Sequence, residues 1–138
     1  MEQATFTFEK YQIDKFSFDI ENATNKRTSV KIDPSGDFFS SESKFVLTFK
    51  FYAFDKELGF EKSFVECLLT AIFNFSEDIK NIDDIPTYFY ANSIAIVFPY
   101  LRAFISSLTI QANIIPVILP TMNLTSLSVP LKENVTIK

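Results

Sequence analysis

Two long stretches of alternating apolar residues constrain the fold of this chain more than any other feature of its sequence. In residues 43–54, and again in residues 62–75, every second position is apolar. Successive side chains of a strand point to opposite faces of a sheet, so a period of two is typical of β-strands. The connection over residues 55–59 is short and contains glycine, as hairpin connections do. The sequence therefore predicts an antiparallel β-hairpin over residues 43–75.

The second face of this hairpin is half apolar. On the return strand it consists of Phe64, Glu66, Leu68, Thr70, Ile72 and Asn74. Antiparallel sheets with one face in water usually alternate more strictly between apolar and polar residues. This face therefore indicates either a second layer of structure or an exposed apolar patch.

The first forty residues predict one interrupted strand and one short strand. Residues 5–20 alternate, but the apolar phase slips by one residue near Glu9 and again near Asp14. A slip of one residue moves the side chains to the opposite face, so each break predicts a bulge or a change of packing partner. Residues 29–33 predict a short strand, which the turn signature Pro-Ser-Gly-Asp at residues 34–37 would end.

From about Asn92 the period of the sequence changes to that of a helix. Apolar residues recur there at spacings of three and four, namely Ile94, Val97, Leu101, Ile105, Leu108 and Ala112. Such a stripe predicts an amphipathic helix, and Pro99 within it predicts a kink or a true start near Phe98. Residues 114–120 contain two prolines, which exclude a regular helix or a central strand. We expect this apolar segment to lie extended in a groove or against a partner.

The composition excludes most kinds of catalytic and ligand chemistry. The chain has no histidine, one cysteine, two glycines and a net charge of −4. Without histidine and with one thiol, we expect no metal site and no histidine base. Two glycines do not build a phosphate-binding loop, so we expect no ATP and no other cofactor. The acidic charge argues against nucleic acid as a partner. Cys67, in the middle of a predicted strand, is expected to be a buried, unreactive thiol.

One catalytic alternative remains in the acidic pairs Glu77-Asp78 and Asp83-Asp84, which lie in one predicted loop. Paired carboxylates hold hard cations or cleave glycosides, but adjacent acids in a loop are usually only solvated, and we expect no enzyme. The N-terminus lacks a secretory signal pattern, and prolines and polar residues interrupt the most apolar stretch, residues 93–119. We therefore expect a cytoplasmic protein without a membrane span.

Residues 96–108 resemble the start of the main helix in the SecB-type protein-export chaperones of bacteria. The matching residues are Phe98, Pro99, Tyr100, Arg102, Ile105 and Ser106, whereas Leu101 and Ala103 depart from the family pattern. The resemblance extends over about residues 5–127, and residues 71–73 and 116–124 also resemble segments of the family.

This resemblance implies one α+β domain over residues 1–138, with a four-stranded antiparallel sheet, a long helix packed on one face, and assembly as a dimer of dimers. The family holds unfolded polypeptide clients without ATP and delivers them to the SecA ATPase. Some SecB-like proteins instead serve one client, the antitoxin of a toxin–antitoxin system. A third hypothesis, which does not depend on the resemblance, is a structural β-rich subunit without a client.

The resemblance also implies site residues. The residues that would line the client-binding groove, if they are not plain core, are Val30, Ile32, Phe38, Phe39, Ile115, Val117 and Leu119. Asp19 and Glu66 fall where the family places acids that dock SecA, although Lys15 falls where the family often has another acid. The family's second helix is not expected here, because residues 125–138 contain Pro130 and β-branched residues. We expect residues 128–138 to form an edge strand or a flexible tail.

Overall fold

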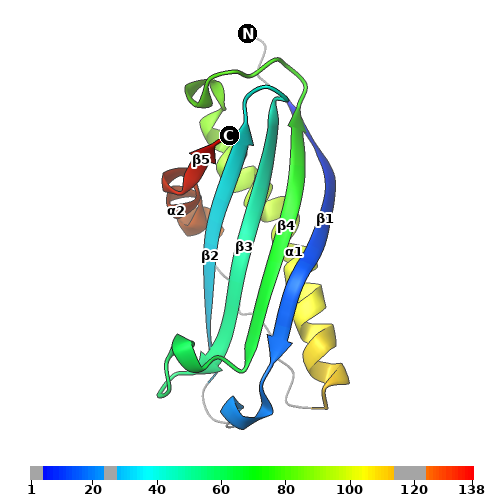
Figure 1. Ribbon diagram of the computed structural model, residues 1–138, viewed down its shortest axis with the longest axis vertical. Helices are drawn as coiled ribbons and strands as arrows, with labels where there is room; N and C mark the ends of the chain where they lie inside the picture. The colour runs from blue at the N-terminus through cyan, green and yellow to red at the C-terminus, as the bar shows by residue number, and fades with distance from the viewer. Residues whose placement is uncertain (1–4, 24–27, 114–123) are drawn as a thin grey trace.

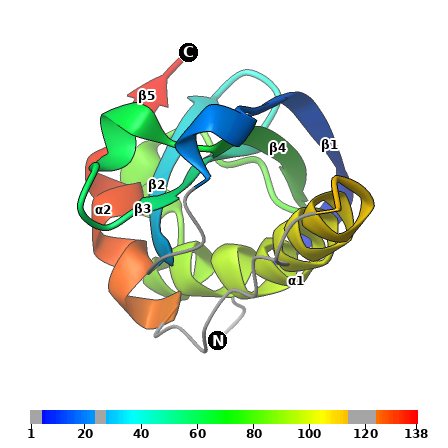
Figure 2. The same ribbon diagram turned by 90° about the horizontal axis from the view of Figure 1, so that it is seen from below.

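The computed structural model describes residues 5–23, 28–113 and 124–138. Its strands, β1 (Phe6–Phe18), β2 (Thr28–Phe39), β3 (Lys44–Asp55), β4 (Val65–Phe75) and β5 (Val135–Ile137), form one sheet in the order β1-β4-β3-β2-β5. The long helix α1 (Thr87–Gln111) lies along one face of this sheet, and the short helix α2 (Ser128–Glu133) lies beside β2 (Figure 1, Figure 2). The predicted α+β class with a long helix on one face is confirmed, but the predicted count of four strands omitted β5.

The predicted hairpin is confirmed as β3 and β4, which pair antiparallel. Alternate residues of β3 are completely buried, namely Phe45, Leu47, Phe49, Phe51 and Ala53. The α1 residues Ile94, Val97, Leu101 and Ile105 are completely buried as well, so the core lies between the sheet and α1. No helix of the described segments covers the sheet face turned toward the viewer in Figure 1. The half-apolar second face of the hairpin is therefore open in this part of the chain, although Leu68 and Ile72 on it are half-buried and Phe64 is 6% exposed.

The two phase slips in β1 are β-bulges. Its pairing with β4 shifts register between Phe8 and Lys10 and again between Ile13 and Lys15. Each extra residue, Glu9 or Asp14, restores the apolar side chains to the face that packs on α1. The two acidic side chains lie on the other face, where Asn74 and Thr70 donate hydrogen bonds to them.

The predicted turn at residues 34–37 is wrong, because β2 continues without a break to Phe39. The Gly36 N–H donates to the Asn134 carbonyl oxygen at 3.1 Å, so Gly36 directs its main-chain groups away from β3. Pro34 lies two residues earlier, so its main-chain groups are also directed away from β3. A proline has no N–H, but at this position the N–H would not bond β3. Gly36 provides space rather than a turn, since a Cβ at this position would overlap the Phe45 ring.

The helix α1 begins five residues earlier than the predicted start at Asn92 and continues through Pro99, so the alternative start near Phe98 is wrong. Pro99 removes the hydrogen bond to the Ala95 carbonyl, but both residues are exposed, so water can bond that oxygen. By length and composition α1 passes the test for a membrane-spanning helix. A core helix passes the same test, and α1 packs as one.

The absence of a second helix was also wrongly predicted, because residues 128–133 form α2. Pro130 is the third residue of α2, in the first turn, where a main-chain N–H has no partner inside the helix. The Leu131 side chain is completely buried and anchors α2 to the core. The edge strand expected for the tail is confirmed only over Val135–Ile137, which pair parallel to Gly36–Phe38 of β2.

Candidate binding surfaces

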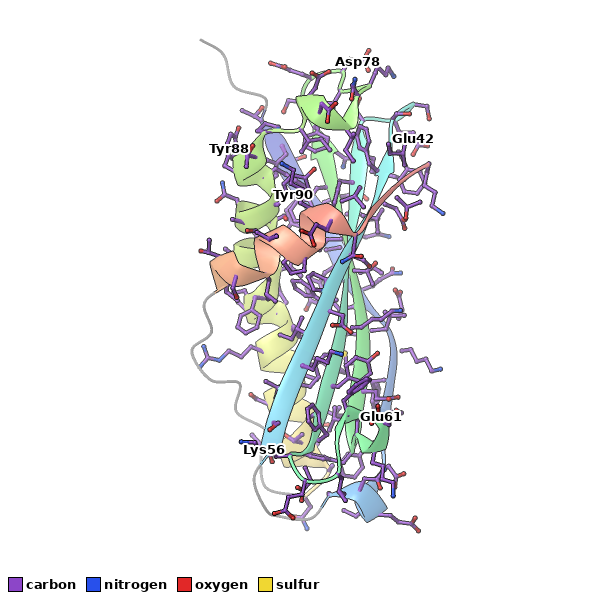
Figure 3. All side chains as sticks on the ribbon, turned by 90° about the vertical axis from the view of Figure 1, so that its left-hand side faces the viewer. Glu42, Lys56, Glu61, Asp78, Tyr88 and Tyr90 are labelled. Carbon is purple, nitrogen blue, oxygen red and sulfur yellow. The ribbon has the colours of Figure 1, made fainter. Side chains whose placement is uncertain are left out.

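The first candidate surface is the side of β2 that faces away from β3. β5 pairs with β2 only at Gly36, Asp37 and Phe38. N-terminal to Gly36, no strand of the described residues pairs with this side of β2. Figure 3 faces this side, and it shows β2 running down the view while α2 and β5 reach only its upper part. We call the outward main chain of residues 28–35 the β2 edge.

The β2 edge has a defined set of main-chain groups. The Gly36 hydrogen bond shows that the main-chain groups of Gly36 are directed away from β3, and such groups recur at every second residue of a strand. The main-chain groups of Val30, Ile32 and Pro34 are therefore directed away from β3 as well. Val30 and Ile32 each offer an N–H and a carbonyl oxygen, whereas Pro34 offers only its carbonyl. A polypeptide in extended form can bond such a row of groups whatever its sequence.

A pocket of about 600 Å³ lies where the β2 edge meets β5. Its lining comes from residues 33–35 of β2, Lys50 of β3, Pro130 and Glu133 of α2, and residues 134–136. Since the pocket borders the unpaired stretch, it gives a chain that lies along the β2 edge room for a side chain.

The predicted client-binding residues are distributed unevenly around this edge. Phe38 is completely buried and Ile32 is 7% exposed, so both belong to the core. Val30 is half-buried against the same core, and Phe39 is half-buried on the opposite face of the sheet, with Lys44 Nζ 4.9 Å from its ring centre. The remaining three, Ile115, Val117 and Leu119, lie outside the described residues.

The second candidate surface is formed by aromatic side chains of β1 and α1. The Tyr11 and Tyr100 rings stack with their centres 4.5 Å apart, and Phe16 meets Phe104 edge-on at 5.6 Å. Phe16 is 49% exposed, Tyr100 41% and Tyr11 39%. We call these four residues the aromatic flank. The aromatic flank was not predicted, although Tyr100 and Phe104 are four residues apart and so lie on one helix face, beside the core stripe.

The two predicted docking acids lie at one end of β1 and β4 but differ in their surroundings. Asp19 caps a short 3₁₀ turn and accepts hydrogen bonds from the Glu21 N–H at 3.0 Å and from Asn22 Nδ2 at 3.3 Å. Glu66 is exposed on the open face of the sheet, and it lines a pocket of about 230 Å³ together with Lys15 and Lys50. This part of the face therefore carries both signs of charge.

Tyr52 lies in the same pocket as Glu66. Partial burial, followed by the negative charges of Asp33 and Glu66, raises the pKa of the Tyr52 hydroxyl. The hydroxyl therefore stays protonated at neutral pH and is available only as a neutral hydrogen-bonding group. This arrangement offers a polar contact but no nucleophile.

Cys67 and the acidic residue Asp78 both lie in surroundings that are typical of structural residues. Burial raises the pKa of the Cys67 thiol to about 11, so the reactive thiolate is scarce at neutral pH. Asp78 forms an ion pair with Lys80 at 3.0 Å and accepts a hydrogen bond from the Ser43 hydroxyl, and the bond to Lys80 lowers the pKa of Asp78. In the described residues no group of three or more His, Cys, Asp or Glu side chains is arranged to hold a metal ion.

The chain is similar to two known proteins, one in sequence and one in fold. No family model matches the chain. The uncharacterized protein MJ0357 of Methanocaldococcus jannaschii is 35% identical over 132 residues, which cover 91% of this chain and 84% of that protein. The chain belongs to the family of that protein.

The fold has a solved counterpart. The SecB-like chaperone Rv1957 of Mycobacterium tuberculosis, in complex with a ChAD peptide from the HigA1 antitoxin Rv1956, matches with a TM-score of 0.68 and 14% identity. The match covers 86% of this chain and 88% of that one. This chain therefore has a divergent SecB-like fold, as the resemblance in residues 96–108 implied.

Proposed function

We propose that this protein is an ATP-independent chaperone of the cytoplasm that holds an antitoxin-like client in extended form. The observation that carries the proposal is the unpaired β2 edge, with its adjacent pocket, in a fold shared with a SecB-like chaperone that has an antitoxin peptide bound. A protein that binds only the unfolded form of a client shifts the folding equilibrium of that client by mass action, without ATP.

The β2 edge supplies the affinity in this proposal. The client adds as a strand, and its main chain bonds the N–H and carbonyl groups of Val30 and Ile32 and the carbonyl of Pro34. Val30 and Phe39 contact the client through their exposed parts, whereas Ile32 and Phe38 support the edge from the core. Ile115, Val117 and Leu119 stay in the proposal as further groove residues.

A second candidate is a general export chaperone that delivers clients to SecA. The exposed carboxylate of Glu66, near Asp19, favours it. The dedicated client has more support, because Lys15 and Lys50 share the pocket of Glu66 and offset the negative charge that a basic tail would recognise.

The aromatic flank serves a different partner in this proposal. It lies beside β1, which is the other edge strand of the sheet, and its four rings leave apolar surface in water. A second copy of the chain is its proposed occupant, so that two sheets join through β1 and α1, as in a dimer of dimers. Large aromatic residues at the centre of an interface typically supply most of its binding energy.

The test of the chaperone proposal is binding of a chemically unfolded client, measured as delayed aggregation and by calorimetry. The variant Val30→Pro removes one outward N–H of the β2 edge without removing a bond to β3, whereas the matched control Val30→Ala keeps that N–H and loses the side chain. We expect Val30→Pro to bind about fivefold more weakly, since one main-chain hydrogen bond contributes about 1 kcal/mol, and Val30→Ala to lose less affinity.

The possible outcomes distinguish the dedicated chaperone, the export chaperone and the structural subunit. A parent protein that delays aggregation of no client contradicts the proposal and leaves the structural subunit. Equal losses of client affinity in Val30→Pro and Val30→Ala would instead mean that side chains, and not main-chain groups, bind the client. Binding of many unrelated precursors and of SecA would favour the export chaperone over the dedicated one.

A further inference from the structure

The strand β5 occupies part of the same edge that the proposed client would use. The residues that flank β5 add two main-chain hydrogen bonds at the ends of the pairing, from the Gly36 N–H to the Asn134 oxygen at 3.1 Å and from the Lys138 N–H to the Phe38 oxygen at 2.8 Å. These are outward groups of β2, in line with those of Val30 and Ile32. A client strand that continues along β2 past Ser35 therefore meets β5.

The side chains of β5 hold it weakly. The strand has three residues; Val135 is half-buried, Thr136 is exposed, and Ile137 is 59% exposed. Three residues are at the lower limit of strand length. Segments with few buried apolar contacts and exposed main-chain hydrogen bonds open at low free energy, without global unfolding.

The helix α2, in contrast, is anchored independently of β5. The Leu131 side chain is completely buried, and Lys132 Nζ lies 6.0 Å from the centre of the Tyr90 ring. Asn134 ends α2, and its side chain donates to the Pro130 oxygen at 2.7 Å. The chain therefore has a fixed helix, a defined helix end at Asn134 and a short strand beyond it, so β5 can leave β2 while α2 stays in place.

We infer that β5 is a displaceable strand, which covers the C-terminal part of the β2 edge until a client strand replaces it. The inference rests on the proposed function for the identity of the competitor, but the opening of β5 is a property of the free protein. The pocket beside residues 33–35 and 134–136 is where the incoming strand first meets β5.

The test locks β5 in place. Asp37 and Thr136 are register partners on adjacent strands, at a separation that suits a disulfide, so the variant Asp37→Cys, Thr136→Cys should join β5 to β2 on oxidation. The native Cys67 is buried, which keeps it out of the exchange. A second variant ends the chain after Asn134. The control is the locking variant under reducing conditions.

We expect the truncated chain to bind an unfolded client at least about tenfold more tightly than the parent, because an open state usually makes up about 10% or less of the molecules. The oxidised lock should bind at least tenfold more weakly than its reduced form. Hydrogen exchange supplies the readout in the free protein: the amides of Gly36 and Lys138 should exchange by local opening, and the disulfide should suppress that exchange. With client bound, the Gly36 amide should stay protected while the Lys138 amide loses protection.

Exchange of these two amides only on global unfolding, or equal affinity of the locked and reduced forms, would overturn the inference. Failure of the parent, truncated and reduced forms to bind any client contradicts the chaperone proposal instead, and local exchange of Gly36 and Lys138 would still support a displaceable β5.

Discussion

The two edges of the sheet are built differently. β1 is bulged at Glu9 and Asp14, and aromatic rings on α1 lie beside it. β2 is continuous over twelve residues, pairs with β3 without a shift, and carries only the short β5 at one end. Bulges and covering residues protect a sheet edge from added strands, whereas a regular edge accepts them. The difference fits the two proposed partners, a second copy of the chain that binds the aromatic flank beside β1 and a client strand that adds reversibly to the β2 edge.

The strongest test of this contrast concerns the aromatic flank. We expect the double variant Tyr11→Glu, Phe16→Glu to lose self-association completely, because both side chains are substantially exposed and two charges would have to be buried in the proposed interface. Light scattering measures the native mass. The matched control is Val129→Glu on α2, which is 60% exposed and lies outside the flank.

A drop in mass for Val129→Glu alone would move the interface to α2. A parent protein that is already a monomer would remove the proposed second copy from β1. In either case the difference between the two edges would need another explanation.

The bulges offer a second test, with the free energy of unfolding as the measurement. Deleting Gln12, a regular residue of β1, reverses the faces of the β1 residues that precede it, whereas deleting the bulge residue Asp14 removes the bulge and leaves every inward residue on its face. The inward residues reversed by the first deletion are Phe6, Phe8 and Tyr11. At about 1 kcal/mol for each partly buried side chain, we expect losses of about 3 kcal/mol for the first deletion and less than about 1 kcal/mol for the second.

Equal losses for the two deletions would show that β1 is held by its main chain and not by its apolar face. Urea unfolding of both variants, followed by circular dichroism, gives the two values under the same conditions.

The continuity of β2 depends on Gly36, which gives a third test. A methyl group at this position overlaps the Phe45 ring, and overpacking of a core typically destabilises it by about 1–3 kcal/mol. We expect Gly36→Ala to lose stability in this range, and the loss to shrink when Phe45→Leu removes part of the ring. An additive double-mutant cycle would contradict this role for Gly36, since residues in contact should couple.

Local pattern predicted the parts of the fold that local forces determine. The period of two in residues 43–54 located β3, and the slips at Glu9 and Asp14 located both bulges, because burial of one face fixes the register of a strand. The predicted stripe of α1 located four buried core residues, Ile94, Val97, Leu101 and Ile105, whereas Leu108 and Ala112 are half-buried. The first turn was missed because Phe89 and Tyr90 lie before the start that the stripe indicated.

The errors occur where tertiary contacts give a local signal another meaning. Pro34 and Gly36 have turn chemistry, but the first faces an unpaired edge and the second faces a ring. Pro130 lies in a first helical turn, which a sequence without a known helix start cannot reveal. The β2 edge was missed for the same reason, since unpaired main-chain groups leave no trace in side-chain periodicity. The resemblance suggested Val30 and Ile32, but it did not indicate that their main chain is the exposed part.

The smallest expected effect tests what keeps the β2 edge free. Pro34→Val adds one outward N–H, keeps an apolar side chain at a buried position and leaves the bonds to β3 unchanged. We expect its stability to change by less than about 1 kcal/mol, as volume-conserving apolar substitutions usually do. The matched variant Ser35→Pro removes an N–H that points to β3, and an unsatisfied partner there should destabilise it by about 1–3 kcal/mol.

The two variants should also differ in self-association. With its N–H restored, the β2 edge of Pro34→Val can pair with a second β2 edge, so its native mass should rise with concentration while the aromatic flank remains unchanged. A large loss of stability in Pro34→Val would mean that residue 34 points toward β3, and the β2 edge would then start at a different residue. If the mass stays constant, β5 and α2 already prevent two β2 edges from meeting, and a single proline is not what distinguishes this edge from β1.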